Sequence, residues 1–202
     1  MKSIAQIKEE LKTMTPDMAD AFIAAYSEDG RSGVQALVVK AAKIKDALAK
    51  ELERLEKMRV YEHQYEENYT YICGIDEAGR GPLAGPVVAG AVILPKDKDI
   101  LYVNDSKKLS EKCREKLYVQ IMEEALAASV GIVDNEVIDD INILQATYEA
   151  MRQAVASLKV APQALLNDAV IIPGINLPQE KIIKGDAKSI SIASASIIAK
   201  VT

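Results

Sequence analysis

The sequence predicts an α/β protein in two parts: a small all-helical domain, followed by a mixed sheet flanked by helices. Two observations support this prediction. Apolar residues recur at helical spacing before residue 60, whereas short apolar runs rich in β-formers alternate with helical segments after residue 71. We therefore expect a helical module at residues 1–60, a linker at 61–70 and an α/β domain at 71–202.

Three helices account for the apolar pattern of the first 60 residues. Ile4, Ile7 and Leu11 share one face of the first, apolar residues within 18–26 mark the second, and those within 34–58 mark a long third. The following segment has no clear period and is rich in Tyr, Glu and amides, which is typical of a linker.

Five short apolar runs after the linker predict strands. The first two are joined by a turn-rich run too short for a crossover helix, so they should pair antiparallel. The strands are expected at 71–75, 87–94, 129–133, 164–170 and 181–184, and helices at 111–128 and 141–158. A last helical segment starts at Ser189 and stops abruptly at Thr202, so we expect a chain truncated at its C-terminus.

The composition excludes several classes of protein. Cys73 and Cys113 are too few for a disulfide framework or a zinc finger and are expected to be reduced thiols. One histidine, His63, leaves little scope for histidine-based catalysis, so catalysis would depend on carboxylates. Neither a membrane-spanning apolar run nor the apolar core of a secretory signal occurs, which predicts a cytoplasmic protein without a membrane partner.

The net charge of −5 argues against a nucleic-acid partner at first sight, because Lys and Arg drive phosphate binding. The part from residue 71 onward carries 14 basic and 17 acidic residues, a net charge of −3. If four of its carboxylates held two divalent cations, this part would carry +1. The acidic composition is therefore compatible with a polyanionic substrate.

Two consecutive acids, Asp76 and Glu77, end an apolar strand and precede a glycine-rich run. Buried ionised carboxylates need a partner or a metal. Strand alternation would point these two side chains to opposite faces, so both serve one site only if the strand loses regular geometry at Glu77. A glycine-rich hairpin with an acidic turn is the alternative that the pair alone leaves open.

Two further acids, Asp168 and Asp186, also follow apolar strands. Carboxylates are hard oxygen ligands of the kind that Mg²⁺ and Mn²⁺ prefer. Three acidic strand ends on one sheet therefore indicate one shared metal centre.

Four long motifs occur together in this chain. They are GIDEAGRGPLAGPV at 74–87, NDSKKLS at 104–110, INILQATYEAM at 141–151 and KGDAKSISIASASIIAKV at 184–201. In this order and spacing, from about Tyr71 to Thr202, the chain closely resembles ribonuclease HII, the type 2 ribonucleases H. The resemblance implies that residues 71–202 form an RNase H-like catalytic domain.

The resemblance also implies a site and a reaction. Four carboxylates would bind two divalent metal ions, Mn²⁺ or Mg²⁺, and the matching positions are Asp76, Glu77, Asp168 and Asp186. The backbone of the Gly-Arg-Gly turn would recognise the ribonucleotide 2′-hydroxyl, and three lysines would lie near the phosphates. These substrate-binding positions are Gly79, Arg80, Gly81, Lys107, Lys108 and Lys184. The expected activity is hydrolysis of the RNA strand of RNA–DNA hybrids, including 5′ to single ribonucleotides in duplex DNA, leaving 3′-OH and 5′-phosphate ends.

Three departures from the family pattern qualify these expectations. Family members commonly carry glycine after the third acid, where this chain has Ala169. Many members lack an extension like residues 1–60. Family chains continue past the position of Thr202 and there include a tyrosine that packs on the nucleotide beside the junction. A catalytically impaired fragment that binds RNA–DNA hybrids is therefore the alternative.

Overall fold

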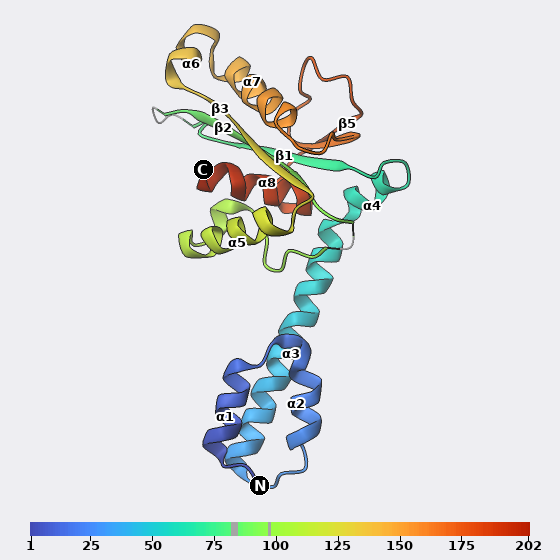
Figure 1. Ribbon diagram of the computed structural model, residues 1–202, viewed down its shortest axis with the longest axis vertical. Helices are drawn as coiled ribbons and strands as arrows, with labels where there is room; N and C mark the ends of the chain where they lie inside the picture. Colours follow the sequence, from blue (N-terminus) through green and yellow to red (C-terminus); the bar gives the residue numbers. More distant parts are fainter. Residues whose placement is uncertain (82–84, 97) are drawn as a thin grey trace. The chain divides into compact units, whose positions relative to one another are not determined.

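The computed structural model describes residues 1–81, 85–96 and 98–202 (Figure 1). The chain divides into two compact units, Met1–Arg54 and Leu55–Thr202. Within the described residues, no helix combines the length and the apolar character needed to cross a membrane.

The first unit is helical, as the apolar spacing predicts. It contains α1 (Ile4–Thr13), the 3₁₀ helix η1 (Pro16–Met18), α2 (Ala19–Tyr26) and most of α3 (Ser32–Met58). Ser3 caps α1, because its hydroxyl accepts a hydrogen bond from the Gln6 amide. The core of this unit consists of Ile7, Phe22, Val34, Leu37 and Ala41.

The second unit contains the sheet and the remaining helices. Its elements are α4 (Val60–Glu66), β1 (Ile72–Ala78), β2 (Val87–Ile93), η2 (Ser106–Lys108), α5 (Glu111–Glu124), β3 (Ala127–Val133), α6 (Asn135–Ile141), α7 (Ile143–Ala156), β4 (Ala164–Asp168), β5 (Gln179–Ile182), η3 (Gly185–Ala187) and α8 (Ile190–Val201). All five predicted strands are present, although β5 begins earlier than expected. The turn expected between β1 and β2 lies partly outside the described residues, at positions 82–84.

Three helices differ from the sequence-based expectation. The helix expected at 111–128 ends at Glu124, because Ala127 and Ala128 pair with Ile93 and Val92 of β2 as the start of β3. Most of the expected linker forms α4, because Tyr61 and Tyr65, one turn apart, pack with Tyr69 against a small apolar cluster of the second unit. The apolar face of α4 consists of tyrosine rings, so a search for aliphatic residues at helical spacing does not detect this helix. α6 was missed, and Asn142, at φ +68°, separates it from α7 and caps α7 with its side chain.

The sheet has the strand order β3-β2-β1-β4-β5. β1 and β2 are antiparallel, as predicted, whereas β4 runs parallel to both β1 and β5. α7 covers one face of the sheet, and α8, with α5 packed against it, covers the other (Figure 1). The predicted mixed sheet flanked by helices is confirmed.

Glycines let both covering helices approach the strands closely. A Cβ added to Gly74 would lie 2.1 Å from the carbonyl carbon of Ser191 in α8, and a Cβ added to Gly90 would lie 2.3 Å from the carbonyl oxygen of Ala195 in the same helix. On the opposite face, a Cβ added to Gly131 would lie 1.9 Å from the carbonyl oxygen of Ala150 in α7. Any side chain at these three positions would displace a helix.

We expect Gly131→Ala to lower the free energy of unfolding by about 1–3 kcal/mol or more, since backbone atoms of α7 must move to admit the methyl group. Gly85→Ala is the matched control, because no atom of the described residues lies within 4 Å of its added Cβ, and it should change the free energy by less than about 0.5 kcal/mol. Urea denaturation measures both. Equal stability of the two variants would contradict the close packing of α7.

Candidate functional site

Parallel pairing brings the predicted acids to one edge of the sheet. β1, β4 and β5 point in the same direction, so their carboxyl ends lie at the same edge. Asp76 and Glu77 lie near the end of β1, and Asp168 is the last residue of β4. Asp186 lies in η3, just after β5, rather than directly at a strand end. The four acids therefore come from three neighbouring segments: the end of β1, the end of β4 and the 3₁₀ helix that follows β5.

The loss of regular strand geometry at Glu77, which the sequence analysis named as the condition for both acids to serve one site, does not occur. β1 remains paired with β2 through Glu77 and Ala78, because the antiparallel register continues without a bulge. Side-chain alternation places Asp76 and Glu77 on opposite faces, yet Glu77 lines the same pocket as Ser196, which lies beside Asp76, so the pocket reaches both faces at the end of the strand. The chain departs from the strand at Gly79, whose φ of +88° and close approach to Pro86 O both require glycine.

Asp76 is the most deeply perturbed acid. Burial raises the pKa of Asp76 to about 8, and the neighbouring charge of Glu77 adds to this increase. Two neighbours act in the opposite direction: the Ser196 hydroxyl beside the carboxyl, and the Glu77 amide, which donates to Asp76 Oδ1 at 2.8 Å. The Ser196 hydroxyl donates to Ser106 Oγ at 2.9 Å, which connects the surroundings of Asp76 through α8 to η2.

Glu77 keeps one oxygen without a partner. Burial also raises the pKa of this carboxyl, although the Arg80 guanidinium lowers it, with Nη1 lying 3.3 Å from Oε1. Glu77 Oε2 is buried and has no hydrogen-bond partner among the described residues. A buried acceptor of this kind is costly unless a cation or donor reaches it.

Asp168 and Asp186 are linked through η3. Asp168 Oδ1 accepts a hydrogen bond of 2.7 Å from the Gly185 amide, which precedes Asp186. Burial raises the pKa of Asp186, and the charges of Asp105 and then Asp168 raise it further. Asp105, whose Oδ1 accepts from the Lys107 amide at 2.9 Å, is therefore a fifth acid at the site. Sequence reasoning missed it, although it lies inside the NDSKKLS motif.

The donor set fits a divalent cation chemically. All the acids offer hard oxygen ligands, Glu77 Oε2 is unpartnered, and burial opposes the ionised forms of Asp76, Glu77 and Asp186. Across the described ranges, no three carboxylate, histidine or cysteine side chains gather as a cluster able to hold a metal ion. Hydrogen bonds to the protein hold Asp76, Glu77 and Asp168 in other directions. Metal ligation at this edge therefore requires side chains to turn from these partners.

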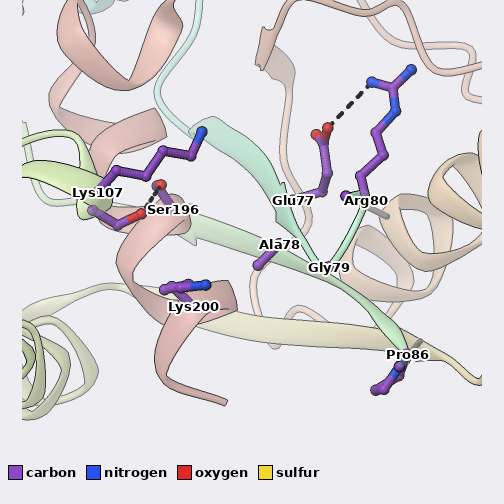
Figure 2. A pocket seen from close by; sticks show the side chains of 11 residues that line it. Glu77, Ala78, Gly79, Arg80, Pro86, Lys107, Ser196 and Lys200 are labelled. Atoms are coloured by element: carbon purple, nitrogen blue, oxygen red, sulfur yellow. Dashed lines mark hydrogen bonds and ion pairs between the residues drawn. The ribbon is translucent and has the colours of Figure 1, made fainter. Parts of the chain in front are cut away.

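A pocket of about 480 Å³ opens beside Glu77. In Figure 2, Glu77 and Arg80 lie on one side of it and Lys107, Ser196 and Lys200 on the other. Other predicted substrate-binding residues in its lining are Gly79 and Gly81.

Two predicted lysines lie outside the lining of this pocket. Lys108 is exposed, with its Nζ 3.7 Å from Asp105 Oδ2, and Lys184 is exposed just before η3. Sequence reasoning missed Ser106, Ser196 and Lys200. The spacing of Ser196 and Lys200, one helical turn apart in the last motif, was the available signal.

Two residues next to the acids have left-handed backbone. Ala169 follows Asp168 with φ +56°, and Lys184 precedes η3 with φ +58°. A glycine adopts this conformation without the penalty that a Cβ adds. The backbone at Ala169 therefore takes a conformation suited to glycine, the residue that ribonucleases HII commonly carry at this position.

The raised pKa of Asp76 predicts that stability depends on pH. The ordinary value of this carboxyl is 3.8 and the folded value about 8, so the folded state binds more protons between these limits. The free energy of unfolding should then fall as the pH rises through this window. In a chelating buffer we expect Asp76→Asn to flatten the profile and to add about 1–3 kcal/mol at its alkaline end.

Urea denaturation across this pH range measures the effect. Asp140→Asn is the control, because Asp140 is exposed on α6, and it should keep the wild-type slope. A slope as steep in Asp76→Asn as in the wild type would contradict the assignment.

We expect Ala169→Gly to raise the free energy of unfolding by about 0.5–1 kcal/mol, because relief of the left-handed strain exceeds the added freedom of the unfolded chain. Ala156→Gly is the control, since Ala156 is exposed in α7 and should lose up to about 1 kcal/mol. Thermal denaturation compares the two. Destabilisation by both glycines would contradict strain at Ala169.

Comparisons with known proteins also divide the chain in two, although their boundary falls between residues 66 and 73 and not at the limit of the first compact unit, Arg54. Residues 3–66 match the family profile "Ribonuclease HII N-terminal domain" and residues 73–202 match "Ribonuclease HII". Among solved structures, the ribonuclease H2 from Pyrococcus horikoshii OT3 is 32% identical with a TM-score of 0.56, covering 65% of this chain and 71% of that one. The RNase H-like architecture is therefore confirmed.

Sequence relatives extend the likeness to the whole chain. A Ribonuclease HII from Clostridioides difficile (strain 630) is 54% identical over 202 residues, which is 100% of this chain and 79% of the relative. Another from Lachnoclostridium phytofermentans is 59% identical over 177 residues, covering 88% of this chain and 69% of the relative. Since both family profiles match in order and these relatives share more than half of their aligned residues with it, the chain belongs to the ribonuclease HII family and is an endoribonuclease that hydrolyses phosphodiester bonds.

Proposed function

We propose that the chain cleaves the RNA strand of RNA–DNA hybrids, including 5′ to single ribonucleotides embedded in duplex DNA. The products would be 3′-OH and 5′-phosphate ends, and the reaction would need two divalent ions, Mg²⁺ or Mn²⁺. One observation carries the proposal: the carboxyl ends of β1 and β4 and the following 3₁₀ helix η3 present acids at one sheet edge, beside a pocket lined by glycine backbone and Lys107. The reducing cytoplasm is the proposed location, in keeping with the free thiols of Cys73 and Cys113.

Asp76, Glu77, Asp168 and Asp186 are the proposed metal ligands and catalytic residues. Divalent ions bound there would stabilise the attacking water and the leaving 3′-oxygen of a phosphodiester. The backbone of Asp76 and Glu77 is held in a paired strand, while the side chains of Asp76, Glu77 and Asp168 would turn from their present hydrogen-bond partners to reach the ions. Three of them, Asp76, Glu77 and Asp186, have raised pKa values through burial, so cations would favour their ionised forms.

The turn after β1 is the proposed reader of RNA. Gly79 has left-handed backbone, and within the described parts of the chain no atom lies within 4 Å of a Cβ added to Gly81, which supports close approach of a sugar to this backbone. A 2′-hydroxyl is the group that distinguishes RNA from DNA at such a contact. Arg80, Lys107, Lys108 and Lys184 are the proposed contacts to phosphate, with Arg80 and Lys107 in the pocket and the other two exposed beside the acids.

The proposal predicts metal-dependent cleavage that one carboxylate substitution abolishes. Removing a metal ligand costs several kcal/mol of transition-state stabilisation, so Asp168→Asn should lower kcat at least about 100-fold in saturating Mg²⁺ or Mn²⁺. The assay uses an RNA–DNA hybrid, a duplex with one ribonucleotide and an RNA-free duplex, with end-group analysis of the products. Asp140→Asn, exposed on α6, should cleave like the wild type.

Wild-type turnover by Asp168→Asn would refute the role of the acids. Cleavage of RNA-free DNA would refute recognition of the 2′-hydroxyl. Tight binding of the hybrid without turnover by the wild type would favour the alternative, a catalytically impaired hybrid-binding fragment.

A further inference from the structure

A buried carboxylate on α4 is joined to the first turn of α8. Glu62 is only 6% exposed, and its Oε1 accepts three hydrogen bonds from α8 and its cap. The donors are the Ser189 hydroxyl at 2.6 Å, the Ser191 amide at 3.0 Å and the Ser191 hydroxyl at 2.6 Å. These residues lie in the same compact unit, although 127 residues separate Glu62 from Ser189.

This contact restrains the helix start in two ways. Ser189 uses the same oxygen to cap α8, accepting from the Ile192 amide at 3.1 Å while donating to Glu62. A negative charge at the N-terminus of a 12-residue helix is also favoured by the helix dipole. Hydrogen bonds to an ionised acceptor are stronger than neutral ones. Glu62 therefore orients the cap and adds direct bonds to the first turn.

The restrained segment lies between two residues of the proposed active site. Upstream, Ser189 donates its amide to Gly185 O at 2.8 Å, closing the turn that contains Asp186. Downstream, Ser196 follows Ser191 by five residues, about 7.5 Å along the helix axis, and contacts Asp76 and Ser106. A shift of the start of α8 would therefore move the chain at Asp186 and the Ser196 hydroxyl together.

Packing against the sheet makes α8 sensitive to such a shift. Its backbone lies directly over Gly74 and Gly90, where it leaves no space for a Cβ. A rotation or slide cannot be absorbed by side chains at these two positions. Glu62, which fixes the helix at one end, therefore influences the whole helix.

Burial of the Glu62 carboxylate costs folding free energy, which indicates that its bonds to α8 have a role beyond stability. Its second oxygen, Oε2, is buried without a hydrogen-bond partner in the described part of the chain. Burying a carboxylate with an unpartnered oxygen costs free energy that a smaller neutral acceptor would avoid. Glu62 also falls within the segment that matches the N-terminal domain of the family. That domain thus supplies a side chain to the helix beside the candidate active site.

We propose that Glu62 is a positioning residue for the reaction: it holds the start of α8 so that Asp186 and the Ser196–Asp76 contact keep their geometry. This inference rests on the proposed roles of Asp76 and Asp186. Glu62 touches no reacting group in this account and acts only through α8. Loss of Glu62 should therefore reduce turnover more than substrate binding.

The test compares Glu62→Ala and Glu62→Gln with Tyr65→Phe in the full chain. Tyr65 is also on α4, and its ring packs on the apolar cluster that includes Ile192 of α8, packing that Phe keeps. The substitution removes only its hydroxyl, which donates to Glu180 of β5 at 3.1 Å. Misplacement of about 1 Å can cost about 100-fold in rate, so Glu62→Ala should lower kcat about 10- to 100-fold with KM within about threefold. Glu62→Gln keeps an acceptor but not the charge and should lose about two- to tenfold.

Amide hydrogen exchange supplies a readout independent of catalysis. Glu62→Ala should speed exchange in the first turn of α8, while Tyr65→Phe should leave this protection and kcat unchanged. Wild-type kcat in Glu62→Ala would overturn the proposal. Equal losses of kcat in Glu62→Ala and Tyr65→Phe, in proportion to their losses of melting temperature, would also overturn it, because they would reflect general destabilisation. If the wild type itself fails to cleave, the proposed function is refuted, whereas faster exchange in Glu62→Ala would still support the restraint of α8.

Discussion

The parallel pairing of β4 with both β1 and β5 is the constraint on which the candidate site depends. Strand direction, rather than sequence proximity, brings Asp76, Glu77 and Asp168 to one edge and places Asp186 just beyond it. The same pairing concentrates negative charge where water is partly excluded. Burial therefore raises the pKa values of Asp76, Glu77 and Asp186, because the ionised forms lose hydration and repel one another. A cation near these carboxylates would favour their ionised forms.

Close packing of helices on the sheet keeps this edge rigid. Gly74 and Gly90 allow the backbone of α8 to contact β1 and β2, which brings the Ser196 hydroxyl of α8 beside Asp76 of β1. Ser106 connects the same hydroxyl to η2, near Asp105. The hydrogen bonds around the acids therefore belong to a continuous framework, and a displacement of α8 would alter several of them at once.

The N-terminal segment contributes to this framework in a direct way. Helix α4 lies within the match to the family's N-terminal domain, yet its residues belong to the compact unit that contains the sheet. Glu62 bonds the start of α8, and Arg59 donates to the carbonyl of Lys96 and to Asp99 in the segment after β2. A boundary drawn from sequence composition therefore falls inside a structural unit, since buried polar contacts rather than apolar period join α4 to the strands.

The sequence by itself determined the helical first part, the five strands, the antiparallel β1–β2 pair and the four acids near strand ends, because these depend on local periodicity and turn residues. Only the tertiary structure decided that β1 stays regular through Glu77, that Asp105 joins the acids and that Glu62 reaches α8. These features depend on register and on contacts between residues far apart in the chain. Local pattern carries no information on such contacts, since the free energy that selects them arises only when the elements pack together.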